Sequence, residues 1–231
     1  MEPIDPARHG DALFAAFSED RERRLWTYLN IGPFPTRDAF DAWMQAKCLR
    51  DDPLYHAIID RSTGEAGGFA SLMRIDRGSG VIEIGNVVFA PRLQRSTLAT
   101  EAMYLMMRRV FEELGNRRYE WRCDSLNAAS RRAAERLGFT FEGVFRQARV
   151  YKGRTRDTAW YAMLDQEWAT LRPAYEAWLS DANFVTNRGR TPGYVPDFPT
   201  VPEARRVRSD AGARSSHGGA GRRGSAPRRS S

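Results

Sequence analysis

The sequence is poor in the residues that bind metal ions in proteins. Its 231 residues include only two cysteines, Cys48 and Cys123, and three histidines, His9, His56 and His217. These residues are scattered, and no CxxC pair or Cys/His cluster is present, so we predict no metal site. Without a pattern of paired cysteines, both thiols are expected to be reduced, as in a cytoplasmic protein.

Long hydrophobic runs are also missing. The first ten residues are polar and contain two prolines, which does not match the apolar core of a signal peptide. The longest early apolar run, residues 12–17, is far too short to cross a bilayer. We therefore expect no membrane segment and a cytoplasmic location.

Acidic residues are scarce at one end of the chain. Residues 186–231 hold ten arginines against three acids, a difference equal to the net charge of +7 of the whole chain. The preceding residues are formally neutral, so they lack the basic surface typical of a nucleic-acid-binding domain.

The basic end of the chain also lacks large aliphatic residues. After Arg205 the only one is Val207, and Gly, Ser and Arg dominate. Such a segment cannot bury enough apolar surface to offset its chain entropy. We predict a folded domain at 1–184 and a disordered Arg/Gly/Ser-rich tail at 185–231. The tail could contact RNA or a ribosome weakly through its arginines, or could simply keep the protein soluble.

Hydrophobic periodicity predicts an α+β domain. Helical patterns cover residues 20–28, 36–50, 98–114, 128–137 and 166–179, and strand patterns cover 54–60, 67–76, 81–89, 118–123, 140–145 and 155–164. Short turns join the first three strands into an antiparallel meander. The helix at 98–114 separates two strands, which implies a parallel pair within a mixed, mostly antiparallel sheet flanked by helices.

The junction between the strand ending at Phe89 and the helix beginning near Thr97 is the first candidate site. A helix start presents unpaired N–H groups and the positive end of the helix dipole, which suits phosphate oxygens. Arg92 and Arg95 add positive charge, and Ser96 and Thr97 add hydroxyl donors. The alternative is an ordinary helix start that Ser96 caps.

A second stretch has a specific spacing. Residues 121–143 read WRCDSLNAASRRAAERLGFTFEG: a strand, an Asn, a helix, "GF", and a strand that starts with "EG". This stretch resembles motif B of the GNAT superfamily of N-acetyltransferases, and residues 94–99 (QRSTLA) resemble its motif A. The details strongly resemble the ribosomal-protein N-terminal acetyltransferase branch: Asn127–Ser130, Leu137–Phe139, Glu142–Gly143, Gly153 and Arg156–Asp157. The resemblance runs from about Leu25 to Trp168.

The resemblance implies a GNAT fold that binds acetyl-CoA as cosubstrate, without a metal. It places the pantetheine arm along the backbone of Val87, Val88 and Phe89, and the diphosphate at a loop made of Gln94, Arg95, Ser96, Thr97, Leu98, Ala99 and Thr100. The family's loop reads Q/R-x-x-G-x-G/A, and here Thr97 replaces the first glycine. Its Cβ limits close backbone approach, whereas its hydroxyl can donate to a phosphate. A catalytically weak or inactive CoA-binding module is therefore the alternative to an enzyme.

The resemblance also suggests catalytic groups. Glu83, eleven residues before Gln94, is the candidate general base, acting through water, with a surface carboxylate as the alternative and Glu142 and Glu120 as lesser candidates. Ser130 would protonate the leaving thiolate, unless it is an ordinary helix hydroxyl. Asn127, one turn earlier, either contacts the cofactor arm or caps the helix. Arg131 and Arg132 either reach the phosphates or are solvated.

The acceptor would be a primary amine, either a peptide N-terminus or a small molecule, which attacks the thioester directly in a ternary complex. Its recognition is expected from the loop at 28–34 and from Trp121, Tyr151 and Trp160, unless these aromatic residues belong to the core. His56 and Cys123 are expected to be structural. A monomer and a homodimer both remain open.

Overall fold

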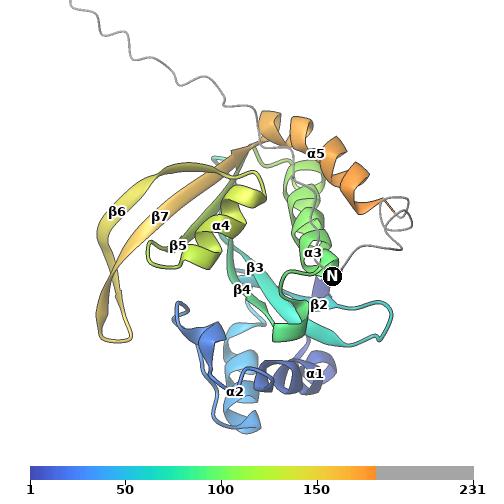
Figure 1. Ribbon diagram of the computed structural model, residues 1–231, viewed down its shortest axis with the longest axis vertical. Helices are drawn as coiled ribbons and strands as arrows, with labels where there is room; N and C mark the ends of the chain where they lie inside the picture. The colour runs from blue at the N-terminus through green and yellow to red at the C-terminus, as the bar shows by residue number, and fades with distance from the viewer. Residues whose placement is uncertain (181–231) are drawn as a thin grey trace, which may run out of the picture. The chain divides into compact units, whose positions relative to one another are not determined.

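A computed structural model describes residues 1–180, so the predicted tail at 185–231 and the boundary at 184 lie outside the described residues. A seven-stranded sheet in the order β1-β2-β3-β4-β5-β7-β6 forms the centre (Figure 1). Only β4 and β5 pair in parallel; every other neighbouring pair is antiparallel. The predicted α+β class and mixed sheet are confirmed.

The first helix was not expected from the sequence. Helix α1 (Pro6–Ser18) follows the short strand β1 (Glu2–Pro3). Its N-cap is Asp5, whose carboxylate accepts from the amide of Ala7 at 2.8 Å, and Pro6 fits the first turn because it has no N–H to satisfy. This helix was missed from the sequence because the first residues of the chain are polar and include two prolines.

The helix predicted at 20–28 is wrong. Arg23 has a left-handed φ of 55°, which breaks a helix, and one 3₁₀ turn, η1 (Arg24–Trp26), follows. Helix α2 (Arg37–Lys47) matches the prediction, and Thr36 caps it by accepting from the amide of Ala39 at 3.2 Å. Helices α1 and α2 pack on β2, β3 and β4 through an aromatic cluster that includes Phe17, Phe40 and Phe69.

The predicted meander is confirmed as β2 (Leu54–Ile59), β3 (Ala66–Asp76) and β4 (Val81–Phe89). After the 3₁₀ turn η2 (Pro91–Leu93), helix α3 (Thr97–Arg108) continues into a π-helical turn, η3 (Arg109–Glu113), and the chain returns as β5 (Arg118–Asp124). The remaining elements are α4 (Ala128–Arg136), β6 (Thr140–Tyr151), β7 (Arg154–Leu164) and α5 (Asp165–Leu179).

The strands β6 and β7 form a long hairpin, which Figure 1 shows curving away from the sheet. Strand β6 runs six residues beyond the predicted end at Phe145. A register irregularity lies between Phe145 and Arg149, where Gln147 has a φ of 50°. This bulge interrupts the alternation from which strands are predicted.

The two faces of the β5–β7 half of the sheet differ in character. One face packs on α3, α4 and α5 through side chains such as Tyr119, Tyr161 and Met163. The opposite face carries Glu83, Glu120, Arg122 and Thr158, and no described helix covers it with an apolar stripe. Among residues 1–180, no helix is long and apolar enough to span a membrane.

Candidate active site

The site is a groove that opens where two parallel strands separate. Strands β4 and β5 pair from Val81↔Arg118 to Ile84↔Trp121, and their pairing stops there. Beyond this point β4 remains paired to β3 only. The groove has a volume of about 1840 Å³ and runs between the two strands, past the start of α3 and one side of α4. One strand edge is therefore free for an extended ligand.

A bulge shapes this free edge. Between Phe69↔Val88 and Ser71↔Gly85, β4 has one residue more than β3, and Asn86 takes a φ of 50°. Buried Ser71 holds the bulge, because its hydroxyl donates to the Gly85 carbonyl at 3.0 Å and accepts from the side-chain amide of Asn86 at 3.1 Å.

Backbone direction alternates along β4. The amide of Ala90 donates to the carbonyl of Gly67 at 2.9 Å, so Ala90 and Val88 direct their backbone groups toward β3. Val87 and Phe89 consequently direct theirs toward the groove. The Phe89 carbonyl already accepts from the side chain of Gln94 at 3.2 Å. Of the three strand residues predicted to meet the arm, Val87 and Phe89 offer backbone groups and Val88 contributes packing.

The start of α3 has free donors. Ser96 is the N-cap: its hydroxyl accepts from the Ala99 amide at 3.1 Å and donates to the Leu93 carbonyl at 2.7 Å. The alternative of a capped helix start is thus confirmed for Ser96. The amides of Thr97 and Leu98 have no acceptor within the described chain. Two N–H groups are therefore unsatisfied at the helix start, and Thr97, which carries the first of them, lines the groove.

The predicted loop residues do not all line the groove. Gln94, Arg95, Ser96, Thr97, Ala99 and Thr100 do, whereas the side chain of Leu98 packs against the core. Thr97 is exposed at the helix start, and Arg95, with a left-handed φ of 59°, turns the chain immediately before it.

Helix α4 supplies arginines on two sides. Arg131 lies outside the groove lining: its Nε donates to the hydroxyl of Tyr161 at 3.1 Å. Arg132 and Arg136 line the groove instead. A helix turns about 100° per residue, so adjacent arginines face different ways. The sequence suggested both Arg131 and Arg132 as phosphate contacts. The rotation of the helix puts only Arg132 of these two in the groove lining.

Ser130 sits in a defined contact at the start of α4. Its hydroxyl accepts from the indole N–H of Trp121 at 3.0 Å, and both residues line the groove. Asn127 is the N-cap and accepts from the Ser130 amide at 3.0 Å, which confirms the capping alternative while leaving Asn127 on the groove wall. Because an indole only donates, Ser130 must accept from Trp121, and its own proton can be donated to another group, of which the Cys123 sulfur is one neighbour.

Glu83 is a buried carboxylate at the bottom of the groove, 3 % exposed. Arg74 donates to its Oε2 at 2.5 Å, and the Nε of Arg122 lies 2.9 Å from the same oxygen as an ion pair. Its Oε1 has no donor among residues 1–180. Burial raises the pKa of Glu83 above its ordinary value, against the opposing effect of Arg122 and Arg74.

Glu120 and Glu142 are the lesser carboxylate candidates, and both form ion pairs. Arg118 donates to Glu120 at 2.8 Å and to Glu142 at 2.8 and 2.6 Å. Neither glutamate lines the groove. Cys123 does line it, but burial raises the pKa of its thiol, so the thiolate is disfavoured. Buried His56 lies on β2, and burial lowers its pKa.

The far side of the groove is enclosed by the η1 loop and the β6–β7 hairpin. Buried Asp124, at the end of β5, accepts from the hydroxyl of Tyr151 at 2.6 Å and from Arg154 at 3.3 Å. Tyr28 donates to the carbonyl of Leu126 at 3.1 Å, and Lys152 donates to that of Trp26 at 2.6 Å. The contacts of Tyr151, Lys152 and Arg154 hold the hairpin tip against the end of β5 and the η1 turn.

Of the predicted acceptor aromatics, three line this groove: Tyr28, Trp121 and Trp160. Trp160 is stacked between Phe145, with ring centroids 4.5 Å apart, and the guanidinium of Arg122, 3.5 Å from its ring centre. Its indole N–H is buried and has no partner in the described part of the chain.

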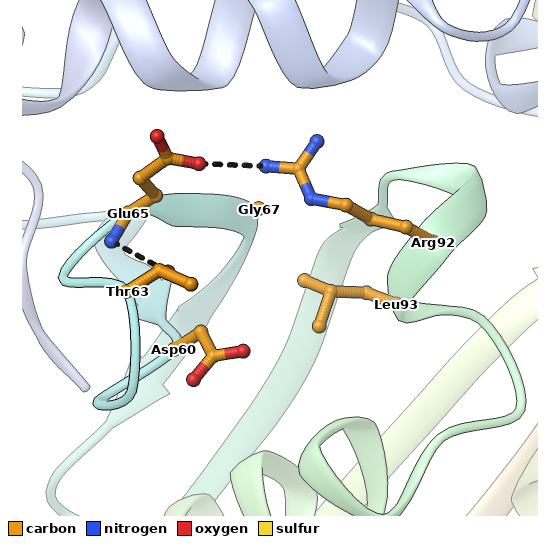
Figure 2. A pocket seen from close by; sticks show the side chains of 6 residues that line it. All are labelled: Asp60, Thr63, Glu65, Gly67, Arg92 and Leu93. Atoms are coloured by element: carbon orange, nitrogen blue, oxygen red, sulfur yellow. Dashed lines mark hydrogen bonds and ion pairs between the residues drawn. The ribbon is translucent and has the colours of Figure 1, made fainter.

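A smaller depression of about 170 Å³ lies between the β2–β3 turn and η2, and it shares no lining residue with the groove. Figure 2 shows its lining, in which Arg92 lies 3.8 Å from Glu65 across Gly67. Arg92 also pairs with Glu19. Both interactions direct Arg92 away from the start of α3, so it does not add charge there as the sequence suggested. Within residues 1–180, no group of three His, Cys, Asp or Glu side chains could hold a metal ion.

Comparisons with known proteins give matches to acetyltransferases. The family model described as "Acetyltransferase (GNAT) domain" matches residues 1–140. A GCN5-related N-acetyltransferase from Brucella melitensis is 50% identical, over 79% of this chain and 82% of that one, with a TM-score of 0.77. A probable acetyltransferase (GNAT family) from Chromobacterium violaceum is 46% identical, over 72% and 83%, with a TM-score of 0.68.

A more distant structure is a spermidine N-acetyltransferase from Vibrio cholerae, 16% identical over 72% of this chain and 95% of that one, with a TM-score of 0.55. This likeness concerns the fold alone. A search of curated proteins gives no match.

Proposed function

The chain belongs to the GNAT family of acetyltransferases, and from this premise we propose that it transfers the acetyl group of acetyl-CoA to a primary amine. The observation that carries the proposal is the separation of β4 from β5 directly beside an uncapped pair of helix N–H groups. This arrangement offers an extended thioester arm a strand edge and offers its diphosphate a helix start.

The residues present fit acetyl-CoA as a cosubstrate. The amides of Thr97 and Leu98 would donate to the diphosphate, and Arg95 and Arg132 would add positive charge. The backbone groups of Val87 and Phe89 would pair with the pantetheine arm. Thr97 is exposed, so its hydroxyl can donate where the family has a glycine.

Acetyl-CoA supplies an acetyl thioester, whose C–S bond breaks as the amine nitrogen forms a C–N bond with the carbonyl carbon. The chain's groups then have three tasks: to accept the amine proton, to stabilise negative charge on the carbonyl oxygen and to protonate the thiolate. A free β4 amide, that of Val87, would stabilise the oxygen, an effect on the order of 3 kcal/mol for one such donor.

We assign the proton acceptor to Glu83, acting directly or through water. Its raised pKa makes it a stronger base than an exposed glutamate, and its Oε1 is left without a donor. Arg74 and Arg122 keep Oε2 engaged and hold the carboxylate in place. After transfer, the proton would leave through water in the groove.

We assign the proton donor to Ser130. Trp121 orients its oxygen, so the hydroxyl can donate its proton to the departing sulfur while water in the groove returns a proton to the serine oxygen. Cys123 also lines the groove, but its raised pKa disfavours an acyl-cysteine route. Direct attack in a ternary complex is therefore the mechanism we favour.

The acceptor is a peptide N-terminus or a small amine, as in the branch that the sequence resembles. We place the protein in the cytoplasm, as a monomer or a homodimer.

For residues 185–231, RNA or ribosome contact is the alternative to a solubilising role. Comparison with a chain that ends at Val185 tests it: unchanged RNA binding and salt dependence would rule out docking by the tail.

The test is release of CoA from acetyl-CoA, followed with a thiol reagent across a panel of amines and peptides, with the acetylated product identified by mass spectrometry. We expect amine-dependent release and intersecting initial-rate lines. Tight acetyl-CoA binding without turnover on a broad panel would instead support a non-catalytic module.

A further inference from the structure

The acceptor side of the groove contains more arginines than carboxylates can neutralise. On this face Glu83 is paired with Arg74 and Arg122, and Asp124 is bound by Tyr151 and Arg154. Glu120, beside them, is paired with Arg118 and Arg122. Each acid is therefore already engaged.

Two arginines on this face lack a carboxylate partner. Arg149 of β6 and Arg156 of β7 stand directly opposite each other in the hairpin, and both line the groove. Neither forms an ion pair with any acid among residues 1–180. Like charges facing each other across two strands are destabilising, so the fold alone gives no reason for this pair.

Unpartnered donors surround the arginine pair. The hydroxyl of Thr158, a residue only 4 % exposed, lines the groove and has no hydrogen-bond partner in the described chain. The Nε of Arg156 and the indole N–H of Trp160 are likewise buried without partners. Arg156, Thr158 and Trp160 alternate along β7, so all three side chains are on one face.

Electrostatics point the same way. The pKa of the Arg149 guanidinium is lowered, first by burial and then by the nearby charges of Arg74 and Arg156. Buried polar groups are normally paired, so the buried, unpartnered donors of Arg156, Thr158 and Trp160, beside the exposed Arg149, indicate that an external anion supplies the missing acceptor.

We propose that Arg149, Arg156 and Thr158 form an anion-binding subsite, and that the physiological acceptor is an amine that carries a carboxylate or a phosphate. This inference rests on the proposed acetyl transfer and names its substrate class. The subsite would bind the anionic group while the amine lies near Glu83.

The position of the pair separates this subsite from the cosubstrate's phosphates. Arg149 and Arg156 share the sheet face of Glu83 and Arg122, whereas α3 and α4 pack on the opposite face. The free amides of Thr97 and Leu98 belong to α3. An anion bound by the arginine pair is thus on the acceptor's side of the β4–β5 opening.

Matched amines test the proposal with the full chain. β-Alanine is compared with β-alaninamide, and phosphoethanolamine with ethanolamine, so that each pair differs in one anionic group; spermidine represents polycations. We expect at least one anionic member to have a kcat/KM about tenfold or more above its neutral partner, as hydrogen bonds to charged groups allow. The preferred pair tells carboxylate from phosphate.

Variants then assign the preference to these residues. In R149Q/R156Q the anionic-to-neutral ratio should fall to about one through a higher KM for the anionic amine. The KM for acetyl-CoA and the kcat for the neutral amine should stay unchanged. R146Q, on the same strand but outside the groove, is the matched control. The Tm of the double variant should not fall, because a repulsive pair is removed; a purely structural role predicts a fall.

Three results are decisive. Equal or faster acetylation of neutral amines or spermidine by the wild type overturns the subsite and leaves acetyl transfer standing. An anion preference that survives R149Q/R156Q also overturns it. If no amine is acetylated, the proposed function fails, and calorimetric titration of the CoA-bound protein with β-alanine and β-alaninamide still decides the subsite: equal affinity refutes it, and a preference lost in R149Q/R156Q supports it.

Discussion

Removal of the Ser130 hydroxyl should have two separable effects, since this oxygen has a structural partner and a proposed chemical role. In Ser130→Ala, the indole N–H of Trp121 loses its acceptor 3.0 Å away. Trp121 is 7 % exposed, so water replaces that acceptor poorly. An unsatisfied buried donor costs about 1–3 kcal/mol. For a domain of this size, each kcal/mol lowers Tm by roughly 2–4 °C.

The same substitution removes the proposed proton donor to the thiolate. Loss of a positioned acid costs about 100-fold to 10,000-fold in rate, so kcat should fall within that range while the KM for acetyl-CoA changes little. Stability is measured by thermal denaturation and turnover by CoA release.

A double-mutant cycle distinguishes the two effects. Trp121→Phe removes the donor, so Ser130→Ala in that background should cost little further stability but should still lower kcat. If Trp121→Phe restores the kcat that Ser130→Ala lost, the loss came from the unpaired indole N–H of Trp121. The assignment of Ser130 as the proton donor would then be refuted.

Three further changes test other parts of the groove. Thr97→Glu should raise the Kd for acetyl-CoA at least about tenfold by placing a negative charge at the free helix amides; unchanged affinity in calorimetry would refute the location of the diphosphate. Glu83 must be ionised to act as a base, and its pKa is raised above 4.5. The kcat/KM should therefore fall as pH drops through this raised pKa; if the same fall persists in Glu83→Gln, another group causes it. Arg132→Ala should weaken acetyl-CoA binding and Arg131→Ala should not, as fluorescence titration of both variants would reveal; equal effects would contradict the groove's lining.

The sheet and the cosubstrate side of the groove could be predicted because their signals are local. The strand at Val81–Phe89 and the cap at Thr36 follow from alternation and capping chemistry within a few residues. By contrast, Pro6–Ser18 begins with a polar, proline-containing turn, and its helix is stabilised by packing on β3 that no local pattern reveals.

The acceptor side could not be predicted because it depends on long-range pairing. Arg149 and Arg156 become neighbours only through the register of a bulged hairpin. The contact of Trp121 with Ser130 likewise requires β5 and α4 to be placed first. Periodicity assigns a residue to a face of the sheet. The order of the strands then decides which acids pair with which arginines on that face.

The most direct test of the account is a crystal structure of the protein with bound CoA. We expect the diphosphate within hydrogen-bond distance of the Thr97 and Leu98 amides, and the pantetheine arm beside Val87 in the opening between β4 and β5. A structure in which side chains fill that opening and CoA binds elsewhere would contradict the account.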